Sequence, residues 1–270
     1  MSEADTLLRR FAHGVVVALR FYSRLPLPSI GVDRPPFAAP SPELLARYAA
    51  PAGAIIGACG ALVLALSRGL GLPLLPSAAL AIGALVLICG ALHEDGLADI
   101  ADGFGGGATR ERKLEILRDS RIGAYGAAAL ALSLILRVAA LSSLAAEGTA
   151  IGAAALIVAG AVSRSFGLIP LAILDPARSD GAGASVGRLD MGAFLLGALA
   201  AFLIAVVLGL AVLGFGRAVL ASIVAAAASF GVAAVARRQI GGQTGDVAGA
   251  AQQLAEIACL CGLLIGESAA

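Results

Sequence analysis

The 270-residue chain has no tryptophan, few other aromatic residues and little charge, and these shortages exclude several classes of protein. Charged residues make up 14% of the sequence, whereas soluble globular domains carry about 25%, so a soluble domain is excluded. The net charge of +1 and the lack of a basic tract indicate no nucleic acid partner. The four cysteines have no cluster of histidines or cysteines around them, so we interpret them as small buried hydrophobic residues and not as zinc ligands.

Long apolar runs dominate what is present. Apolar residues make up 59% of the chain, and glycine (35 residues) and alanine are abundant. A membrane-spanning helix needs about 20 predominantly apolar residues, and small residues let such helices approach closely. We therefore predict an all-α fold, a polytopic membrane bundle of about seven transmembrane helices that forms one catalytic domain over residues 1–270. The predicted spans are 46–66, 73–92, 124–145, 149–174, 191–213, 217–236 and 247–266.

A few polar residues lie inside these predicted spans. The last span fits least well, because it contains Gln252, Gln253 and Glu256. Arg137 and Arg164 lie within apolar spans and either form ion pairs with Glu256 or extend to a membrane interface.

The N-terminal segment and the loops set the predicted orientation. Residues 1–30 interleave arginines with apolar residues and contain no cleavable signal peptide, which predicts an amphipathic interfacial helix. The proline-rich residues 26–42 are predicted to form a loop. Loops 93–123, 175–190 and 237–246 carry more basic residues than the alternate loops. Because basic loops stay in the cytoplasm, we expect the N-terminus and these three loops, with the active site, inside the cell and the C-terminus outside.

Residues 93–126 interrupt the apolar sequence with seven of the chain's 18 acidic residues. Acidic groups beside a membrane span are costly and usually mark a functional site. Asp95, Asp99 and Asp102 are spaced i, i+4 and i+7, which places them on one face of a helix. Because three carboxylates repel one another strongly and oxygen ligands suit Mg²⁺ or Mn²⁺, we predict that this face binds a divalent cation.

Residues that follow the acids indicate phosphate chemistry. Backbone N–H groups of the glycine-rich stretch 103–107 can approach phosphate oxygens closely. Arg118 and Arg121 belong to a group of basic residues that can neutralise phosphates. Ser120 lies between Asp119 and Arg121, just before the third predicted span. Metal, glycine-rich stretch and arginine together indicate phosphoryl or nucleotidyl transfer.

Each of these features also has a purely structural interpretation. The stretch 103–107 fits an ordinary loop, and basic residues beside a span follow from membrane topology alone. His93 is either a general base for a hydroxyl nucleophile or an interfacial residue. Residues 241–246 (GGQTGD) resemble no standard phosphate loop and fit a simple turn. In the functional interpretation, Asp246 adds a further metal or substrate contact.

The motifs taken together resemble those of a known family. HEDGLADIADG (residues 93–103) followed by DSRIGAYG (119–126) resembles the signature of cobalamin synthase, the adenosylcobinamide-GDP ribazoletransferase family. Ile100 and Ala124 stand where the family usually has threonine. Shorter elements that resemble the family's occur in the same order along the chain: FYSRLP (21–26), Arg47-Tyr48 with Pro51 and Gly53, Ser163-Arg164, and GGQTGD (241–246) with Gly249, Ala250 and Glu256.

The resemblance implies a Mg²⁺-dependent transferase in the bacterial inner membrane. Its family joins adenosylcobinamide-GDP to α-ribazole or its 5′-phosphate, releasing GMP, in the last stage of cobalamin nucleotide-loop assembly. On this chain, Asp95, Asp99 and Asp102 become metal ligands and catalytic residues, with Asp119 and Asp246 as further metal candidates and His93 as candidate base. The candidate substrate-binding residues are Gly103, Gly105, Gly106, Arg118, Ser120, Arg121 and Thr244. Expected partners are the corrinoid and ribazole substrates and membrane lipid, with a homo-oligomer or a complex with enzymes of the same pathway as hypotheses.

Two rival functions share part of this pattern. A CDP-alcohol phosphotransferase requires the motif D-x-x-D-G-x-x-A-R, and this chain departs from that motif at Asp99. A divalent-cation transporter predicts acids at mid-bilayer on facing helices, whereas the acids here follow the end of a predicted span. Neither rival explains the full set of motifs.

Overall fold

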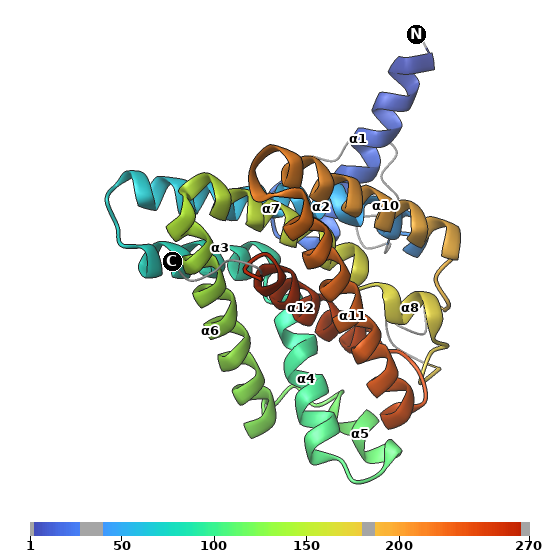
Figure 1. The fold of residues 1–270 in the computed structure, drawn as a ribbon. Helices are drawn as coiled ribbons and strands as arrows, with labels where there is room; N and C mark the ends of the chain where they lie inside the picture. The colour runs from blue at the N-terminus through green and yellow to red at the C-terminus, as the bar shows by residue number, and fades with distance from the viewer. Residues whose placement is uncertain (1–2, 28–39, 180–186, 266–270) are drawn as a thin grey trace.

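Helices form nearly all of the regular structure in the computed structural model, which describes residues 3–27, 40–179 and 187–265 (Figure 1). Long helices pack into a bundle from which the N-terminal part of α1 projects. The helices are α1 (Glu3–Tyr22), α2 (Pro42–Gly69), α3 (Leu74–Cys89), α4 (Leu92–Gly106), α5 (Arg110–Ile116), α6 (Ala124–Glu147), α7 (Thr149–Phe166), α8 (Ile169–Ile173), α10 (Met191–Leu208), the π-helical turn η1 (Gly209–Leu213), α11 (Phe215–Ile240) and α12 (Gly245–Gly262).

Five helical segments of the described chain are long and apolar enough to cross a membrane. They are Pro42–Gly69, Ala124–Glu147, Thr149–Ile173, Met191–Leu213 and Phe215–Ile240. The predicted all-α membrane bundle is therefore confirmed, and each of these segments matches a predicted span. A sixth crossing is available only if α3 and α4, which meet at a 90° bend, count together as one.

The seventh predicted span, residues 247–266, stays a prediction. The segment forms α12, which is not among the five segments that are long and apolar enough to cross a membrane. Its polar residues Gln252, Gln253 and Glu256 are buried among neighbouring helices. The predicted orientation assumed seven crossings, and it stays a prediction.

The apolar run 73–92 does not continue as one helix. Helix α3 ends at Cys89, and Gly90 and Ala91 both adopt positive φ angles of 62° and 56° before α4 begins. The N-terminal segment packs over this bend: the Arg24 N–H donates to the Ile88 carbonyl oxygen at 2.7 Å, and an ideal Cβ on Gly90 would lie 2.1 Å from Arg24 Nε. The bend turns α4 and its acids away from the line of α3.

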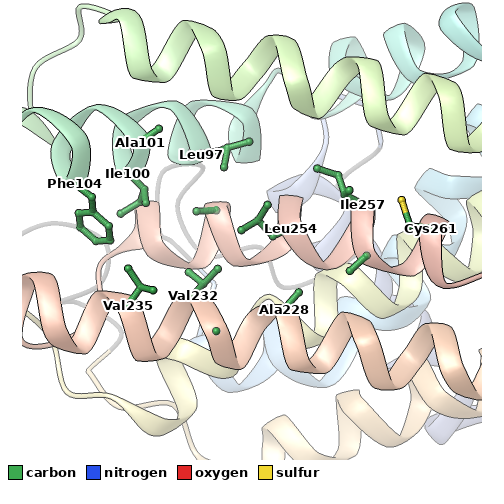
Figure 2. Close-up of a pocket in the computed structure, with 13 residues that line it drawn as sticks. Leu97, Ile100, Ala101, Phe104, Ala228, Val232, Val235, Leu254, Ile257 and Cys261 are labelled. Carbon is green, nitrogen blue, oxygen red and sulfur yellow. The ribbon is translucent and has the colours of Figure 1, made fainter.

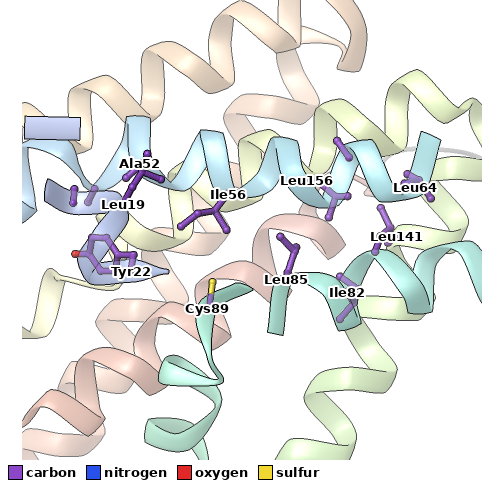
Figure 3. Close-up of a cluster of buried hydrophobic side chains, with 14 of the residues drawn as sticks. Leu19, Tyr22, Ala52, Ile56, Leu64, Ile82, Leu85, Cys89, Leu141 and Leu156 are labelled. Atoms are coloured by element: carbon purple, nitrogen blue, oxygen red, sulfur yellow. The ribbon is translucent and has the colours of Figure 1, made fainter. Parts of the chain in front are cut away.

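The predicted amphipathic helix at the N-terminus is confirmed as α1, although its place at a membrane interface is not tested. Leu7, Leu8 and Phe11 are exposed, while Leu19 and Tyr22 join a hydrophobic cluster with α2, α3, α6 and α7 (Figure 3). Of the loop predicted at 26–42, residues 28–39 lie outside the described residues.

Glycines let α2 and α7 cross with their backbones in contact. An ideal Cβ on Gly53 would lie 2.1 Å from the carbonyl oxygen of Gly160, and one on Gly160 would lie 2.3 Å from that of Gly53. Gly57 faces the carbonyl oxygen of Leu156 in the same way, at 2.3 Å. The abundance of small residues is therefore used for close helix packing, as in other membrane bundles.

We expect Gly160→Ala to destabilise the protein by about 1–3 kcal/mol, because the added methyl group forces α2 and α7 apart. Gly83→Ala on α3 is the matched control, since no atom lies within 4 Å of its ideal Cβ and alanine favours a helix over glycine. Thermal unfolding in detergent, followed by circular dichroism, measures both. Equal stability of the two variants would show that the crossing tolerates a side chain.

Candidate functional site

The acidic face of α4 lies against the first turn of α12. Gly96 and Gly249 meet without side chains between them: an ideal Cβ on Gly96 would lie 2.9 Å from the Asp246 carbonyl oxygen, and one on Gly249 would lie 3.3 Å from Gly96 Cα. This close approach brings Asp246 beside Asp95, which is exposed, and Asp99, which is half-buried.

The carboxylates at this junction repel one another. Burial and the charges of Asp95, Asp246 and Asp102 raise the pKa of Asp99 to about 7. Burial also raises the pKa of Asp246, against the lowering effect of Arg178, whose Nη2 lies 3.7 Å from Asp246 Oδ2. A cation placed here would relieve this repulsion.

No three His, Cys, Asp or Glu side chains stand at metal-binding separation anywhere in the part of the chain that the structure describes. The metal-binding roles of all five acids therefore stay predictions. The donor chemistry at the junction of α4 and α12 is carboxylate oxygen, which suits Mg²⁺ or Mn²⁺.

Asp102 has a structural partner that sets it apart from the other acids. Its carboxylate accepts the Gly123 N–H at 2.7 Å and the Gly126 N–H at 2.9 Å, so it caps the N-terminus of α6 from another helix. An ideal Cβ on Gly123 or Gly126 would lie 2.5 or 2.3 Å from the carboxylate oxygens. Both glycines of the DSRIGAYG motif are therefore required by the carboxylate of the HEDGLADIADG motif.

The glycine-rich stretch forms the end of a helix and not a loop. Residues 103–106 form the last turn of α4, and Gly107 is its C-cap. Gly103 faces the side chain of Leu117, because an ideal Cβ on Gly103 would lie only 2.1 Å from Leu117 Cδ1. Gly105 faces the ring of Tyr125, because its ideal Cβ would lie 2.7 Å from Tyr125 Cγ. These glycines admit α5 and the start of α6 against α4, and a phosphate contact by Gly103, Gly105 or Gly106 stays a prediction.

Asp119, Ser120 and Arg121 lie between α5 and α6. The Arg121 guanidinium donates to both oxygens of Asp119, with Nη2 2.6 Å from Oδ2, and these hydrogen bonds lower the pKa of Asp119 to about 2. Ser120 and Arg118 are exposed beside them. The structure thus pairs Asp119 with a cation of its own loop.

The three polar segments predicted to share one face do come together among the described residues. Gln243 and Pro176 form a bridge, in which the Gln243 N–H donates to the Asp175 carbonyl oxygen at 2.9 Å. Arg110 of α5 donates to the carbonyl oxygens of Ile240 at 2.8 Å and Ala177 at 2.6 Å. Residues 180–186 of the predicted loop 175–190 lie outside the described residues.

Thr244 and Arg178 complete the surroundings of Asp246. The Thr244 hydroxyl donates to Asp246 Oδ2 at 3.2 Å and accepts the Val247 N–H at 3.3 Å, so it is the N-cap of α12. Its predicted substrate contact is untested. Arg178 was not among the predicted site residues, and only its position on the shared face of loop 175–190 pointed to it.

A buried ionic network holds α4, α6 and α12 together. Arg137 of α6, only 1% exposed, has Nη2 3.0 Å from Glu94 Oε1 on α4 and Nη1 3.3 Å from Glu256 Oε1 on α12. Gln252 donates to Glu256 at 2.8 Å, and Gln253 donates to Glu94 at 3.3 Å. The pairing of Arg137 with Glu256 is confirmed, while Glu94 is a partner that the sequence did not indicate. Because Glu94 directly precedes Asp95, the network also fixes the rotation of α4.

His93 and Arg164 lie in the interior beside this network. His93 is buried, and its ring stacks on Tyr22 with the ring centroids 6.0 Å apart. Arg164 donates to Cys89 Sγ at 3.1 Å and to the Gly160 carbonyl oxygen at 3.3 Å, so it does not share the partner of Arg137. His93 lies on the side of α4 opposite Asp95 by helical spacing, and its role as a base stays a prediction.

Comparison with known protein families identifies the family to which the chain belongs. Residues 14–264 match the sequence family described as cobalamin-5-phosphate synthase. The chain belongs to the cobalamin-5-phosphate synthase family. The match covers every residue of the site, and the resemblance found in the motifs is confirmed.

Relatives of this family share most of their length with the chain. Proteins of Azorhizobium caulinodans, Xanthobacter autotrophicus and Mesorhizobium japonicum, each named adenosylcobinamide-GDP ribazoletransferase, are 51%, 52% and 45% identical to it. The alignments cover 95%, 96% and 93% of this chain and 97%, 98% and 93% of the relatives. No solved structure matches the chain.

We expect Asp102→Ala to lower stability by about 1–3 kcal/mol, because two N–H groups of α6, one of them buried, lose their acceptor. Asp95→Ala is the matched control: its side chain is exposed, so the change should stay within about 0.5 kcal/mol. Unfolding in detergent measures both. A stable Asp102→Ala variant would contradict the capping role.

Arg137→Met is expected to lower stability by about 3–5 kcal/mol, because it leaves two buried carboxylates without a cation. The triple variant Arg137→Met, Glu94→Gln, Glu256→Gln should recover most of this loss, since no uncompensated charge remains. Thermal unfolding and the monodisperse fraction on size-exclusion chromatography report the difference. A triple variant no more stable than Arg137→Met would show that the network acts through shape and not through charge.

Proposed function

We propose that this protein joins adenosylcobinamide-GDP to α-ribazole, or to α-ribazole 5′-phosphate, and releases GMP. A ribose hydroxyl oxygen forms a new bond to the phosphorus next to the cobinamide, and the bond from that phosphorus to GMP breaks. The hydroxyl proton leaves to a base, and GMP departs with the electron pair of the broken bond. The products are adenosylcobalamin, or its 5′-phosphate, and GMP.

One observation carries this proposal: the relatives named for this reaction align with the chain almost end to end. The site agrees with that chemistry, because carboxylates on α4 and α12 stand beside arginines on loops that converge there. Phosphoryl transfer depends mainly on positioning and charge stabilisation. Neither a CDP-alcohol phosphotransferase nor a cation transporter is favoured by the family match.

The acidic residues of the site and the arginines near it have different proposed roles. Asp95, Asp99 and Asp246 are proposed to hold Mg²⁺, with Asp102 supporting α6 beside them. When bound, the ion would offset the negative charge of the diphosphate. Arg178, next to Asp246, and Arg118 and Arg121, on the exposed loop before α6, are proposed to bind phosphate oxygens.

The location of the site is also part of the proposal. The basic residues of the three converging loops support a cytoplasmic site in the bacterial inner membrane, by the preference of basic loops for the cytoplasm. Self-association, or a complex with enzymes that supply the corrinoid, remains a hypothesis on which the chemistry does not depend.

The test supplies adenosylcobinamide-GDP and α-ribazole to the purified protein, with and without Mg²⁺, and follows the corrinoid product and GMP by chromatography. We expect Mg²⁺-dependent product and a loss of about 100-fold or more in Asp95→Asn, because one site charge is removed. Glu115→Gln is the control, since Glu115 is exposed on α5 and pairs with Arg112.

The outcomes distinguish the proposed transferase activity from the proposed need for a divalent cation. Product formed equally without any divalent cation would refute the metal role and keep the transferase. A folded preparation that makes no product would refute the transferase, and CDP-alcohol substrates and cation flux would then be measured.

A further inference from the structure

An apolar groove lies between α4, α11 and α12, on the side of α4 away from the acids (Figure 2). Its volume is about 550 Å³, within the range of about 300–1,000 Å³ of small-molecule sites. Every lining side chain is apolar, and the lining includes Leu97, Phe104, Val235, Leu254 and Ile257.

The groove is open along one wall. Gly231 of α11 lines it, and no atom lies within 4 Å of an ideal Cβ at that position. Val235 is 45% exposed and Leu254 is 38% exposed. The space beside Gly231 is thus free of protein atoms and has room for a chain of methylene groups.

The length of the groove matches one leaflet of a membrane. Its lining along α12 runs from Ala250 to Cys261, which at 1.5 Å per residue is about 16 Å. Half of a bilayer's hydrocarbon core is about 15 Å. Helix α11 is long and apolar enough to cross a membrane, so a groove of this length beside it can hold one lipid acyl chain.

A cation lies at one end of the groove. Arg238 follows Val235 by three residues and Gly231 by seven, so helical spacing places it on the same side of α11, one turn beyond Val235. It is exposed. Figure 2 shows Val235 and Phe104 together at one end of the groove and Cys261 at the other, so Arg238 lies beyond the first end.

We propose that an anionic phospholipid binds this groove, with one acyl chain along α12 and its phosphate on Arg238. The apolar lining suits the chain, and the arginine at the end of the span suits the headgroup, as basic residues do at membrane surfaces. The site is separate from the acidic face of α4, and the proposal does not depend on the transferase reaction.

The absence of tryptophan from the chain makes a direct binding test available. Phe104→Trp places a single fluorescent reporter in the groove. Phe230→Trp is the matched control, because Phe230 is 52% exposed on α11 and its side chain points away from the groove by helical spacing. Each full-length protein is reconstituted in phosphatidylcholine vesicles with increasing brominated phosphatidylglycerol or brominated phosphatidylcholine, which quench tryptophan on contact.

We expect the Phe104→Trp reporter to reach half-quenching at an about five-fold lower mole fraction of brominated phosphatidylglycerol than of brominated phosphatidylcholine. The Phe230→Trp reporter should respond equally to both lipids. Arg238→Gln, added to Phe104→Trp, should remove the preference. Gly231→Leu should fill the groove and reduce quenching of the same reporter by both lipids. Gly216→Leu on the same helix is the control, because its ideal Cβ also has no atom within 4 Å but Gly216 does not line the groove, so quenching should not change.

Three results would overturn the proposal. Equal quenching by the two lipids at Phe104→Trp would show ordinary contact with bulk lipid. A preference that survives Arg238→Gln would place the headgroup elsewhere. A reporter that neither lipid quenches would show that no acyl chain occupies the groove; crosslinking to a second copy through Leu254→Cys, absent from the parent protein with its native cysteines, would then identify another protein chain there. If Gly231→Leu fails to fold, Arg238→Gln still decides, because it changes only an exposed side chain.

Discussion

Direct backbone contact between α4 and α12 positions the candidate site. Gly96 and Gly249 leave no room for a methyl group between the helices, and this spacing puts Asp246 within electrostatic reach of Asp95 and Asp99. The same two helices are joined further inside by Arg137, which lies between one glutamate of each. Close packing thus sets the distance between the helices, and the ionic network sets their rotation.

The acids of the HEDGLADIADG motif differ in function although they are close in sequence. Glu94 points into the bundle toward Arg137, Asp102 caps α6, and Asp95 and Asp99 are left on the accessible face. Each buried carboxylate has strong partners, as burial of a charge demands. Within residues 3–27, 40–179 and 187–265, the two accessible acids have no comparable hydrogen-bonded partners, so they remain the most suitable residues for binding a cation or a substrate.

Sequence predicted most of the bundle, because a run of about 20 apolar residues has few alternatives to a spanning helix. It missed the bend at Gly90–Ala91, since the apolar run continues through it and an alanine with positive φ leaves no signature. It left α12 undecided, because the partners of its polar residues Gln252, Gln253 and Glu256 lie on other helices and are visible only in the fold. The convergence of three loops followed from topology, and the family followed from the motifs. The roles of Asp102 and Glu94 required the fold, because their partners lie 24 and 43 residues away along the chain.

The shared use of Arg137 restricts how this interior can change over generations. Glu94 and Glu256 both depend on one guanidinium, so replacing Arg137 leaves two buried carboxylates without a cation, whereas replacing one glutamate leaves a balanced pair. That remaining pair can be lost one residue at a time only through an intermediate with a single unpaired buried charge. We therefore expect Arg137 to be kept wherever at least one of the two glutamates is kept, even though the three positions lie on three different helices.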